Sequence, residues 1–327
     1  MKALPDLSSQ LWVDLAPNPV INHVREKDSA RDAYGDPQVL LPGQYDEQWH
    51  IFFHGFTQDA GQWFHHMVSP DGIHWSLKNK WQSEMGQSFI LKYEDQFIFY
   101  SSCYAGGENG SSTKVEIRAF TTKDFETFSD PVVIATPELD WELEGVYKQV
   151  RNPCVIQLPD GRFRLYYCGG VVFLDDLGYE EPKYVSYAES DSPYGPFVKH
   201  GKPILLPDSS IPHRNLGSGA IKVFGYDDGY LGLYNGIYQD HLGRSTSAIS
   251  LLYSKDGIEW TEADGNPIVY PTDGWKKAIV YQLDLVEWEG MLRIYFNARD
   301  EWRDGIEKIG MLAMPYQGIP IRKLSGY

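Results

Sequence analysis

Five short polar segments each stand directly before an apolar run, and their side chains are the ones that could do chemistry. They are Gly35-Asp36-Pro37, Gly86-Gln87-Ser88, Arg151-Asn152-Pro153, Gly217-Ser218-Gly219 and Tyr281-Gln282. The carboxyl group of Asp36 can accept or hold a proton, whereas the amides of Asn152 and Gln282 can only form hydrogen bonds. A common site requires an architecture that brings these distant segments together.

Each polar segment opens a predicted β-hairpin. The first strands read DPQVLL, QSFILKY, NPCVIQL, GAIKVF and QLDLVEW, and the second strands read WHIFFHGF, QFIFYSSC, RFRLYYCG, GYLGLYNG and MLRIYFNA. Polar turns such as PDG, DDG and WEG join the two strands, as expected for hairpins. The pattern recurs roughly every 60 residues along the chain.

Similar turns recur downstream of four hairpins, which extends each repeat to four strands. These turns are SPDGIHW (69–75), TKDFETF (122–128), SDSPYGPF (190–197) and SKDGIEW (254–260). Ser or Thr, Asp and Gly favour tight turns, and the final aromatic ring can pack between neighbouring sheets. A β-sandwich would not explain the recurring turn, and no long helical periodicity supports a βα-barrel.

The repeat predicts an all-β fold, a five-bladed β-propeller of four-stranded antiparallel blades. We expect one domain over residues 1–327, with blades at about 30–80, 81–140, 145–208, 213–272 and 273–316. In a propeller the innermost strand of each blade lines an axial funnel, so the five polar segments would converge there.

Composition narrows the possible partners and the location. The chain has 29 Lys and Arg against 45 Asp and Glu, a net charge of −16, which disfavours nucleic acid and anionic membrane surfaces. Three cysteines without framework spacing, Cys103, Cys154 and Cys168, predict reduced thiols. With neither a signal-peptide core nor a membrane-spanning run, we expect a cytoplasmic protein. The oligomeric state, including a homo-oligomer, stays open.

Several motifs resemble those of a known enzyme group. DPQVL, QWHIFFHGF and QWFHHMVSPDGIHW look like the first blade of the five-bladed glycosidases of glycoside hydrolase families 32, 43, 68 and 117. RNPCVIQLPDGRFRLYY resembles their third blade, and KYVSYAESDSPYGPF resembles the outer strands that follow it. The resemblance implies a glycoside hydrolase that acts on a short oligosaccharide or glycoside in the funnel.

The resemblance also implies three carboxyl groups: an Asp that acts as base or nucleophile, a second Asp that stabilises the transition state, and a Glu that acts as general acid. The first role falls on Asp36. The second falls on Asn152, where this sequence has an amide that cannot supply negative charge. An engineered Asp→Asn change, a natural enzyme that uses an amide, or a protein that binds sugar without cleaving it would each explain this residue.

The acid is expected at the start of the fourth blade, IPHRNLGSGAIKV, but no Glu occurs between residues 189 and 259. We therefore predict that His213 donates the proton, as the resemblance to family 117 allows. An imidazole with an ordinary pKa near ~6.5 suits this task if a carboxylate raises it. His241 is an alternative in the next hairpin loop, and Glu180 and Glu181 in GYEEPKY are carboxyl alternatives.

Other polar and aromatic residues at the strand ends are expected to bind substrate. They are His54, Trp63, Arg151, Arg214, Asn235, His241, Gln282 and Arg299, with Tyr234 and Asn297 at the same rim. No metal site is predicted, because the adjacent His65 and His66 would point to opposite faces of a strand. No cofactor is predicted, because the chain has no GxxxxGK phosphate loop. A GxSxG elbow is also absent.

Two alternatives to hydrolysis stay open. A glycoside phosphorylase, as in family 130, would need a basic cluster, which Arg151, Arg214, Arg244 and Arg299 could provide. A carbohydrate-binding propeller without activity would explain the missing carboxyl groups. Turnover that depends on phosphate would identify the first, and binding without turnover the second.

Overall fold

The regular structure of this chain consists almost entirely of β-strands. The computed structural model describes residues 5–22, 32–57, 61–105, 114–145 and 147–326. Within these ranges the helices are short 3-10 turns: η1 (Ser9–Leu11), η3 (Asp140–Leu143), η4 (Pro212–Arg214) and η5 (Gly274–Lys276). No helix in these ranges is long and apolar enough to cross a bilayer.

The first two antiparallel groups of strands follow the chain order. The first sheet contains β1 (Asp32–Leu40), β2 (Trp49–Thr57), β3 (Gly61–Ser69) and β4 (Ser76–Gln82). The next group contains β5 (Met85–Tyr93), β6 (Gln96–Ala105), β7 (Lys114–Thr122) and β8 (Val132–Ala135). Each strand in these groups pairs with the strand that follows it, so both groups are built from consecutive hairpins.

A third group is joined to the second by a short parallel pairing. It contains β9 (Lys148–Gln157), β10 (Phe163–Leu174), β11 (Tyr179–Ser190) and β12 (Val198–Lys199). The parallel contact pairs Lys114 with Lys148 and Val115 with Gln149. The second and third groups therefore form one eight-stranded sheet.

The last strands form two further sheets. One contains β13 (Ile221–Tyr226), β14 (Gly229–Gln239), β15 (Ser245–Ser254) and β16 (Thr261–Glu262), and β20 (Ile321–Lys323) pairs with β13 at its edge. The other contains β17 (Ile279–Trp288), β18 (Met291–Arg299) and β19 (Glu307–Pro315). Two bridges, Val13 to Ala313 and Ile21 to Ile309, attach early residues of the chain to β19.

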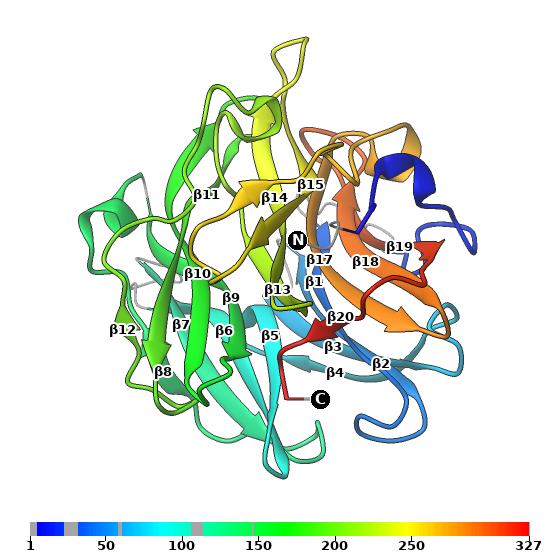
Figure 1. Ribbon diagram of the computed structural model, residues 1–327, viewed down its shortest axis with the longest axis vertical. Coiled ribbons are helices and arrows are strands. Elements are labelled where there is room, and N and C mark those ends of the chain that lie inside the picture. Colours follow the sequence, from blue (N-terminus) through cyan, green and yellow to red (C-terminus); the bar gives the residue numbers. More distant parts are fainter. Residues whose placement is uncertain (1–4, 23–31, 58–60, 106–113, 146, 327) are drawn as a thin grey trace.

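The first strand of each group lies near the middle of the molecule. Figure 1 shows β1, β5, β9, β13 and β17 close to the centre, with later strands of each group farther out. Along this circle β1 contacts β5, β5 contacts β9 and β9 contacts β13, while β17 contacts both β1 and the β14–β15 hairpin. The prediction of an all-β fold is confirmed, and the first four groups have the four antiparallel strands that were expected, whereas the fifth has three.

The recurring Ser/Thr-Asp turns have the same hydrogen bonds in three groups. The hydroxyl groups of Ser69, Thr122 and Ser254 accept the backbone N–H of Gly72, Phe125 and Gly257. The carboxylates of Asp71, Asp124 and Asp256 each accept two backbone N–H groups of the following residues. The repeat seen in the sequence therefore corresponds to one repeated local structure.

Four of the central strands carry a β-bulge at the same point. Two residues face one on the neighbouring strand at Asp36-Pro37, Gly86-Gln87, Asn152-Pro153 and Tyr281-Gln282. Asp36 and Asn152 have φ values of 56° and 54° there. Before β13, Gly219 has a φ of 56°, and a Cβ there would lie 1.9 Å from the Asn235 carbonyl oxygen. Only glycine fits at that point, so the fourth group offers no side chain where the first and third offer Asp36 and Asn152.

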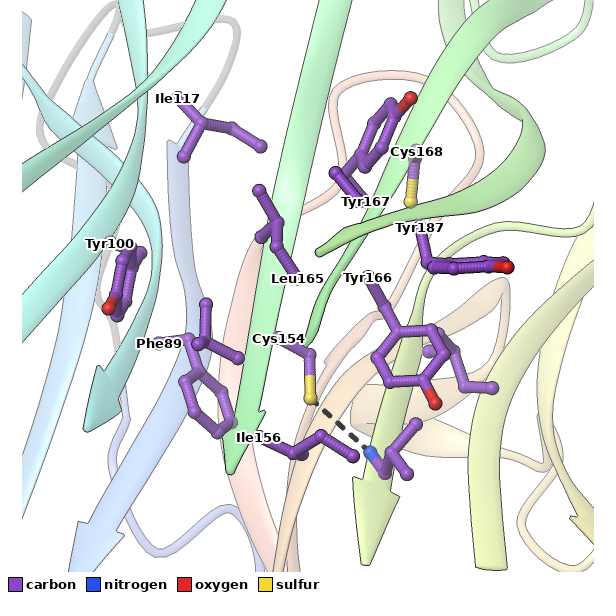
Figure 2. Packing of buried hydrophobic residues seen from close by; sticks show 14 of the residues in the cluster. Phe89, Tyr100, Ile117, Cys154, Ile156, Leu165, Tyr166, Tyr167, Cys168 and Tyr187 are labelled. Atoms are coloured by element: carbon purple, nitrogen blue, oxygen red, sulfur yellow. Dashed lines mark hydrogen bonds between the residues drawn. The ribbon is translucent and has the colours of Figure 1, made fainter. Parts of the chain in front are cut away.

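An apolar core joins the second and third groups beneath these bulges. Figure 2 shows Phe89, Ile117, Cys154 and Leu165 packed together, with the Val223 N–H directed at the Cys154 sulfur. All three cysteines are free and buried. Burial of this apolar surface is the main term that holds the strands at fixed positions.

An ion pair inside the molecule connects β20 to two central strands. The partly buried Lys323 Nζ donates to Asp284 Oδ2 at 2.5 Å and to the Val39 carbonyl oxygen at 2.7 Å. Asp284 Oδ2 also accepts the Val39 N–H at 2.7 Å. Residues from β1, β17 and β20 are thus held together where the sheets meet.

Candidate active site

The bulged ends of the central strands open into one cavity of about 510 Å³. Its lining includes Asp36, His54, Gln62, Gln87, Tyr104, Tyr147, Gln149, Arg151, Asn152, Tyr179, Glu180, Glu181, Asn235, Tyr281, Gln282, Asn297, Arg299 and Glu307. A cavity of this size suits a small ligand. The sequence predicted that the five polar segments converge, and four of them contribute lining residues. The fifth segment, Gly217–Gly219, does not, but Ala220 directly after it lines the cavity.

Asp36 and Asn152 meet at the cavity floor. Asn152 Nδ2 donates a hydrogen bond to Asp36 Oδ1 at 3.2 Å, and both residues are buried. The backbone N–H of Asn152 donates to the Ser102 hydroxyl at 2.9 Å, which holds the amide in place. Asn152 therefore acts as a donor that orients the Asp36 carboxyl group.

Basic groups lie near Asp36, but their effect on its pKa is smaller than the effect of burial. His54 Nδ1 lies 3.3 Å from Asp36 Oδ2, and the buried Lys222 Nζ donates to the Pro153 carbonyl oxygen at 3.3 Å. Burial raises the pKa of Asp36, although His54, Lys222 and Arg151 act to lower it. Burial also lowers the pKa of His54, which favours a neutral imidazole. A raised pKa makes the Asp36 carboxylate a stronger base than an ordinary aspartate.

We expect replacement of Asn152 by aspartate to make stability depend on pH. A carboxyl oxygen would stand where Nδ2 now lies, 3.2 Å from Asp36 Oδ1, and two buried carboxyl groups at this distance share a proton. This sharing raises the pKa of the carboxyl pair in the folded protein above its value in the unfolded chain. The free energy of unfolding is therefore highest below the unfolded-state pKa and falls as the pH rises through the folded-state pKa. Relative to wild type, the Asn152→Asp variant should lose about 1.4 kcal/mol for each unit of pKa rise.

Thermal unfolding of both proteins between about pH 4 and 8 measures this effect. Asn152→Leu is the matched control, because it removes the same hydrogen bond without adding a titratable group. A stability difference between Asn152→Asp and wild type that is independent of pH would contradict the shared-proton explanation.

A long hairpin brings a second carboxyl group into the cavity. Strands β10 and β11 have 12 residues each, and apolar residues near their connection pack against β14 and β17. Asp176 Oδ2 accepts the Ser245 N–H at 2.6 Å, and Arg303 Nη2 donates to the Asp175 carbonyl oxygen at 2.8 Å. The hairpin of the third group therefore contacts both the fourth and the fifth groups of strands. This position places Glu181 in the cavity lining.

Two arginine–glutamate pairs line this side of the cavity. Arg151 Nη2 lies 3.8 Å from Glu181 Oε2, and Arg299 Nη1 lies 3.8 Å from Glu307 Oε1. Asn297 connects the second pair to Asp36, because its Nδ2 donates to Glu307 Oε2 at 3.1 Å and its Oδ1 accepts the Asp36 N–H at 3.2 Å. Each of these two glutamates therefore faces an arginine of its own sheet, and Asn297 links Glu307 to Asp36 in another sheet.

Glu181 is the carboxyl group best suited to donate a proton at neutral pH. Burial raises its pKa from 4.5 to about 7, and the negative charges of Glu307 and Asp36 add to this effect against Arg151 and Arg299. A group with such a pKa is protonated in about half of the molecules at pH 7. It can therefore give up a proton to a leaving group and take one back.

Several buried polar atoms around the cavity have no hydrogen-bond partner among the described residues. They are His54 Nδ1, Gln62 Nε2, Gln87 Oε1, Arg151 Nε, Gln282 Oε1 and Arg299 Nε. An unpaired buried polar atom costs about 1–3 kcal/mol, so a ligand that pairs with several of them gains affinity. The set mixes donors and acceptors, which matches the hydroxyl groups of a sugar.

The structure brings together most of the residues expected from the sequence. Asp36, Asn152, His54, Arg151, Asn235, Gln282, Arg299, Asn297, Glu180 and Glu181 all line the cavity. Trp63, His213, Arg214 and His241 are not among the lining residues. Trp63 instead packs under Lys80, whose Nζ lies 4.7 Å from the ring, and His241 is exposed in a loop.

His213 and Arg214 belong to an ion-pair cluster centred on Glu262. His213 Nε2 lies 3.3 Å from Glu262 Oε2, and Arg214 Nη2 lies 3.8 Å from Oε1. The Tyr234 hydroxyl donates to Glu262 Oε1 at 2.6 Å. Although burial acts to raise it, hydrogen bonds from His213 and Tyr234 lower the pKa of Glu262. His213 was expected at the rim of the funnel, but it does not line the cavity. Its imidazole instead lies beside Glu262 on β16.

Glu307, Tyr179 and the two glutamines Gln62 and Gln149 are lining residues that sequence reasoning did not single out. Glu307 begins β19 and pairs with Arg299 on β18. Its signal was the position of an acid at the start of the strand that follows MLRIYFNAR. Among the described residues, no group of three or more His, Cys, Asp or Glu side chains is arranged to hold a metal ion.

Neither a family model nor a curated sequence matches this chain, but solved structures do. One similar structure has a TM-score of 0.69, 13% identity and 98% coverage of both chains. It comes from work on the GH130 family of mannoside phosphorylases, which contains glycoside hydrolases that target β-1,2 mannosidic linkages in Candida mannan. A glycosyl hydrolase from Bacteroides ovatus has a TM-score of 0.67, 14% identity and coverage of 99% of this chain and 98% of that chain. The chain has the fold of the β-propeller glycosidases.

Another similar structure is that of an enzyme that catalyses a different reaction. An N-acetylgalactosamine deacetylase from F. plautii, in complex with blood group B trisaccharide, has a TM-score of 0.62 and 15% identity, and the match covers 90% of this chain and 92% of that chain. At such identities the likeness shows the propeller fold, which is the level at which the resemblance expected from the sequence is confirmed. The chemistry has to be argued from the site itself.

Proposed function

We propose that this protein is a glycoside hydrolase that acts on a short, neutral oligosaccharide or glycoside. The observation that carries the proposal is the convergence of the buried Asp36 and the partly buried Glu181, two carboxyl groups from separate sheets, on one cavity. Cleavage of a glycosidic bond needs a carboxylate and a proton donor on opposite sides of the bond. Unpaired polar atoms around the same cavity and the fold shared with glycoside hydrolases support a sugar ligand.

We propose further that the chain is one five-bladed propeller. The groups β1–β4, β5–β8, β9–β12, β13–β16 and β17–β19 would be its blades, within the boundaries expected at about 30–80, 81–140, 145–208, 213–272 and 273–316. The parallel pairing of β7 with β9 then joins two neighbouring blades. The circle of contacts supports this arrangement, because the central strands contact one another from β17 through β1, β5 and β9 to β13, and β17 contacts β14 and β15 of the fourth group.

In the proposed mechanism Asp36 and Glu181 have complementary tasks. Asp36, held by the hydrogen bond from Asn152, supplies the negative group that acts as base or nucleophile at the anomeric carbon. Glu181 donates its proton to the glycosidic oxygen as the bond to the leaving sugar breaks. If Asp36 is the base, it takes a proton from the water whose oxygen bonds to the anomeric carbon, and exchange with solvent then removes that proton from Asp36 and reprotonates Glu181. If Asp36 is the nucleophile, it bonds to the anomeric carbon, and the ionised Glu181 then takes a proton from the water that displaces Asp36 and leaves a hydroxyl group on the sugar.

The remaining polar residues bind and orient. Asn152 contributes a donor in place of a second carboxylate, so positive charge that develops on the sugar is stabilised by Asp36 and by the Glu307 carboxylate. Arg299 and Asn297 fix Glu307, and Asn235 and Gln282 bond each other beside it. A natural amide at position 152 fits this scheme, because its hydrogen bond to Asp36 has a role of its own.

Hydrolysis is favoured over phosphorolysis by the distribution of charge. Only Arg151 and Arg299 of the four arginines considered for phosphate line the cavity, and each faces a glutamate. Arg214 pairs with Glu262 and Arg244 pairs with Asp240 elsewhere. Phosphate would enter a cavity where acidic side chains outnumber the arginines, which is electrostatically unfavourable.

The test is release of sugar from a panel of aryl glycosides and short oligosaccharides of mannose, galactose, glucose and arabinose, with and without inorganic phosphate. Hydrolysis that is independent of phosphate supports the proposal. Turnover only with phosphate would identify a phosphorylase. Binding of an oligosaccharide without turnover under either condition would identify a carbohydrate-binding protein and overturn the proposal.

A further inference from the structure

One wall of the cavity has no task in the proposed reaction. The strand pairing places Tyr104 beside Val115 and Val115 beside Gln149, across β6, β7 and β9. Tyr147 stands two residues before Gln149, and all four residues line the cavity. The parallel pairing of β7 with β9 joins the second and third groups of strands at this wall.

Two tyrosine rings on this wall are accessible. Tyr104 is 50% exposed and Tyr147 is 45% exposed, and in the described part of the chain neither hydroxyl has a hydrogen-bond partner. The other two tyrosines of the lining differ, because Tyr179 and Tyr281 are more buried and their hydroxyl groups bond each other. Tyr104 and Tyr147 are therefore available to a ligand, whereas Tyr179 and Tyr281 are already engaged.

The wall also differs from the rest of the cavity lining in charge. Glu181, Glu307 and their arginine partners lie on β11, β18, β19 and the start of β9, whereas the wall presents tyrosine, valine and glutamine side chains. An uncharged wall with aromatic rings and amides matches a neutral sugar, whose C–H face stacks on a ring while its hydroxyl groups bond to amides. An ionic ligand would lose hydration there without gaining a partner.

We infer that Tyr104 and Tyr147 form a second subsite, which binds a neutral pyranose unit next to the sugar at the cleaved bond. This inference rests on the proposed function, and it adds that the substrate has at least two sugar units. The charged side of the cavity holds the reacting bond, and the chain continues over the tyrosine wall. Substrates that reach this wall should be bound more tightly than single-sugar glycosides.

The experiment compares Tyr104→Ala, Tyr147→Ala and the double variant with the wild-type protein. Tyr270→Ala is the matched control, because Tyr270 is 43% exposed and does not line the cavity. For each sugar of the panel, kcat/KM is measured on the aryl monosaccharide and on the di- and trisaccharide. In parallel, calorimetry measures binding of the same oligosaccharides to the full-length proteins.

Loss of one stacking ring should weaken the contact with the second sugar by roughly 3- to 10-fold. The single variants are therefore expected to lose roughly 3- to 10-fold in kcat/KM on oligosaccharides, the double variant roughly 10- to 100-fold, and none of them much on the aryl monosaccharide. The Tyr270→Ala variant should match wild type on all substrates.

The outcomes separate this inference from the function on which it rests. If wild type hydrolyses the panel and the variants lose equally on short and long substrates, or not at all, the subsite is overturned and the hydrolase stands. If wild type binds oligosaccharides without turnover and the variants lose that binding, the subsite stands and the hydrolase does not. If wild type neither cleaves nor binds any sugar, both are overturned.

Discussion

The Asp36→Asn variant is expected to lose roughly 10³-fold in kcat/KM on every substrate that wild type cleaves. An amide at this position can keep the hydrogen-bonding shape of the carboxyl group, but it can neither accept a proton nor carry negative charge. The loss should therefore appear in kcat, with little change in substrate affinity. Steady-state kinetics and calorimetric binding of an uncleaved oligosaccharide measure the two quantities separately.

Burial makes a stability control necessary for this variant. Because Asp36 is buried and its pKa is raised by that burial, the neutral amide should leave the melting temperature unchanged or slightly higher near neutral pH. Asp264→Asn, at an exposed position, is the matched surface control and should keep full activity. An Asp36→Asn protein that folds normally and retains more than about a tenth of wild-type kcat would remove Asp36 from the mechanism.

The Glu181→Gln variant should show a loss that depends on the leaving group. On oligosaccharides, whose leaving sugar must be protonated, kcat/KM should fall roughly 10²- to 10⁴-fold. On nitrophenyl glycosides, whose leaving group departs without a proton, the fall should be less than about 10-fold. Kinetics on both substrate classes at pH 6 give the ratio directly.

The pH profile provides a second readout of the same residue. The pKa of Glu181 is raised to about 7, and the acid is active only when protonated, so wild-type activity on oligosaccharides should fall as pH rises through about 7. The Glu181→Gln variant should lack this decline. Glu259→Gln, an exposed control, should keep it. If Glu307→Gln shows the leaving-group dependence and Glu181→Gln does not, the acid is Glu307.

The floor of the site could be predicted from the sequence because it repeats. Every central strand starts with a polar segment before an apolar run, so the position of Asp36 and Asn152 followed from the period of the chain. The bulges at Asp36-Pro37 and Asn152-Pro153 confirm that these segments share one local structure. Their left-handed backbone, with φ of 56° at Asp36 and 54° at Asn152, belongs to the same feature.

The acid was harder to predict because it does not follow the repeat. Glu180 and Glu181 read as a solvated loop, and only the length of the β10–β11 hairpin and its packing on β14 and β17 turn Glu181 into the cavity. His213 was expected in the cavity but lies outside its lining, because it pairs with Glu262, which is distant in the sequence. Such contacts depend on how sheets pack, and residue type and local spacing carry little information about them.

The β10–β11 hairpin has a consequence for how the protein acquires activity during folding. Each hairpin can form by itself, since its strands are neighbours in the chain, but Asp36, Glu181 and Glu307 come from the first, third and fifth groups of strands. Bringing them together requires closure of very long chain segments, which is a slow and late event. Native strand content therefore precedes catalytic competence, and a chain with all of its hairpins formed remains inactive until the last sheets dock.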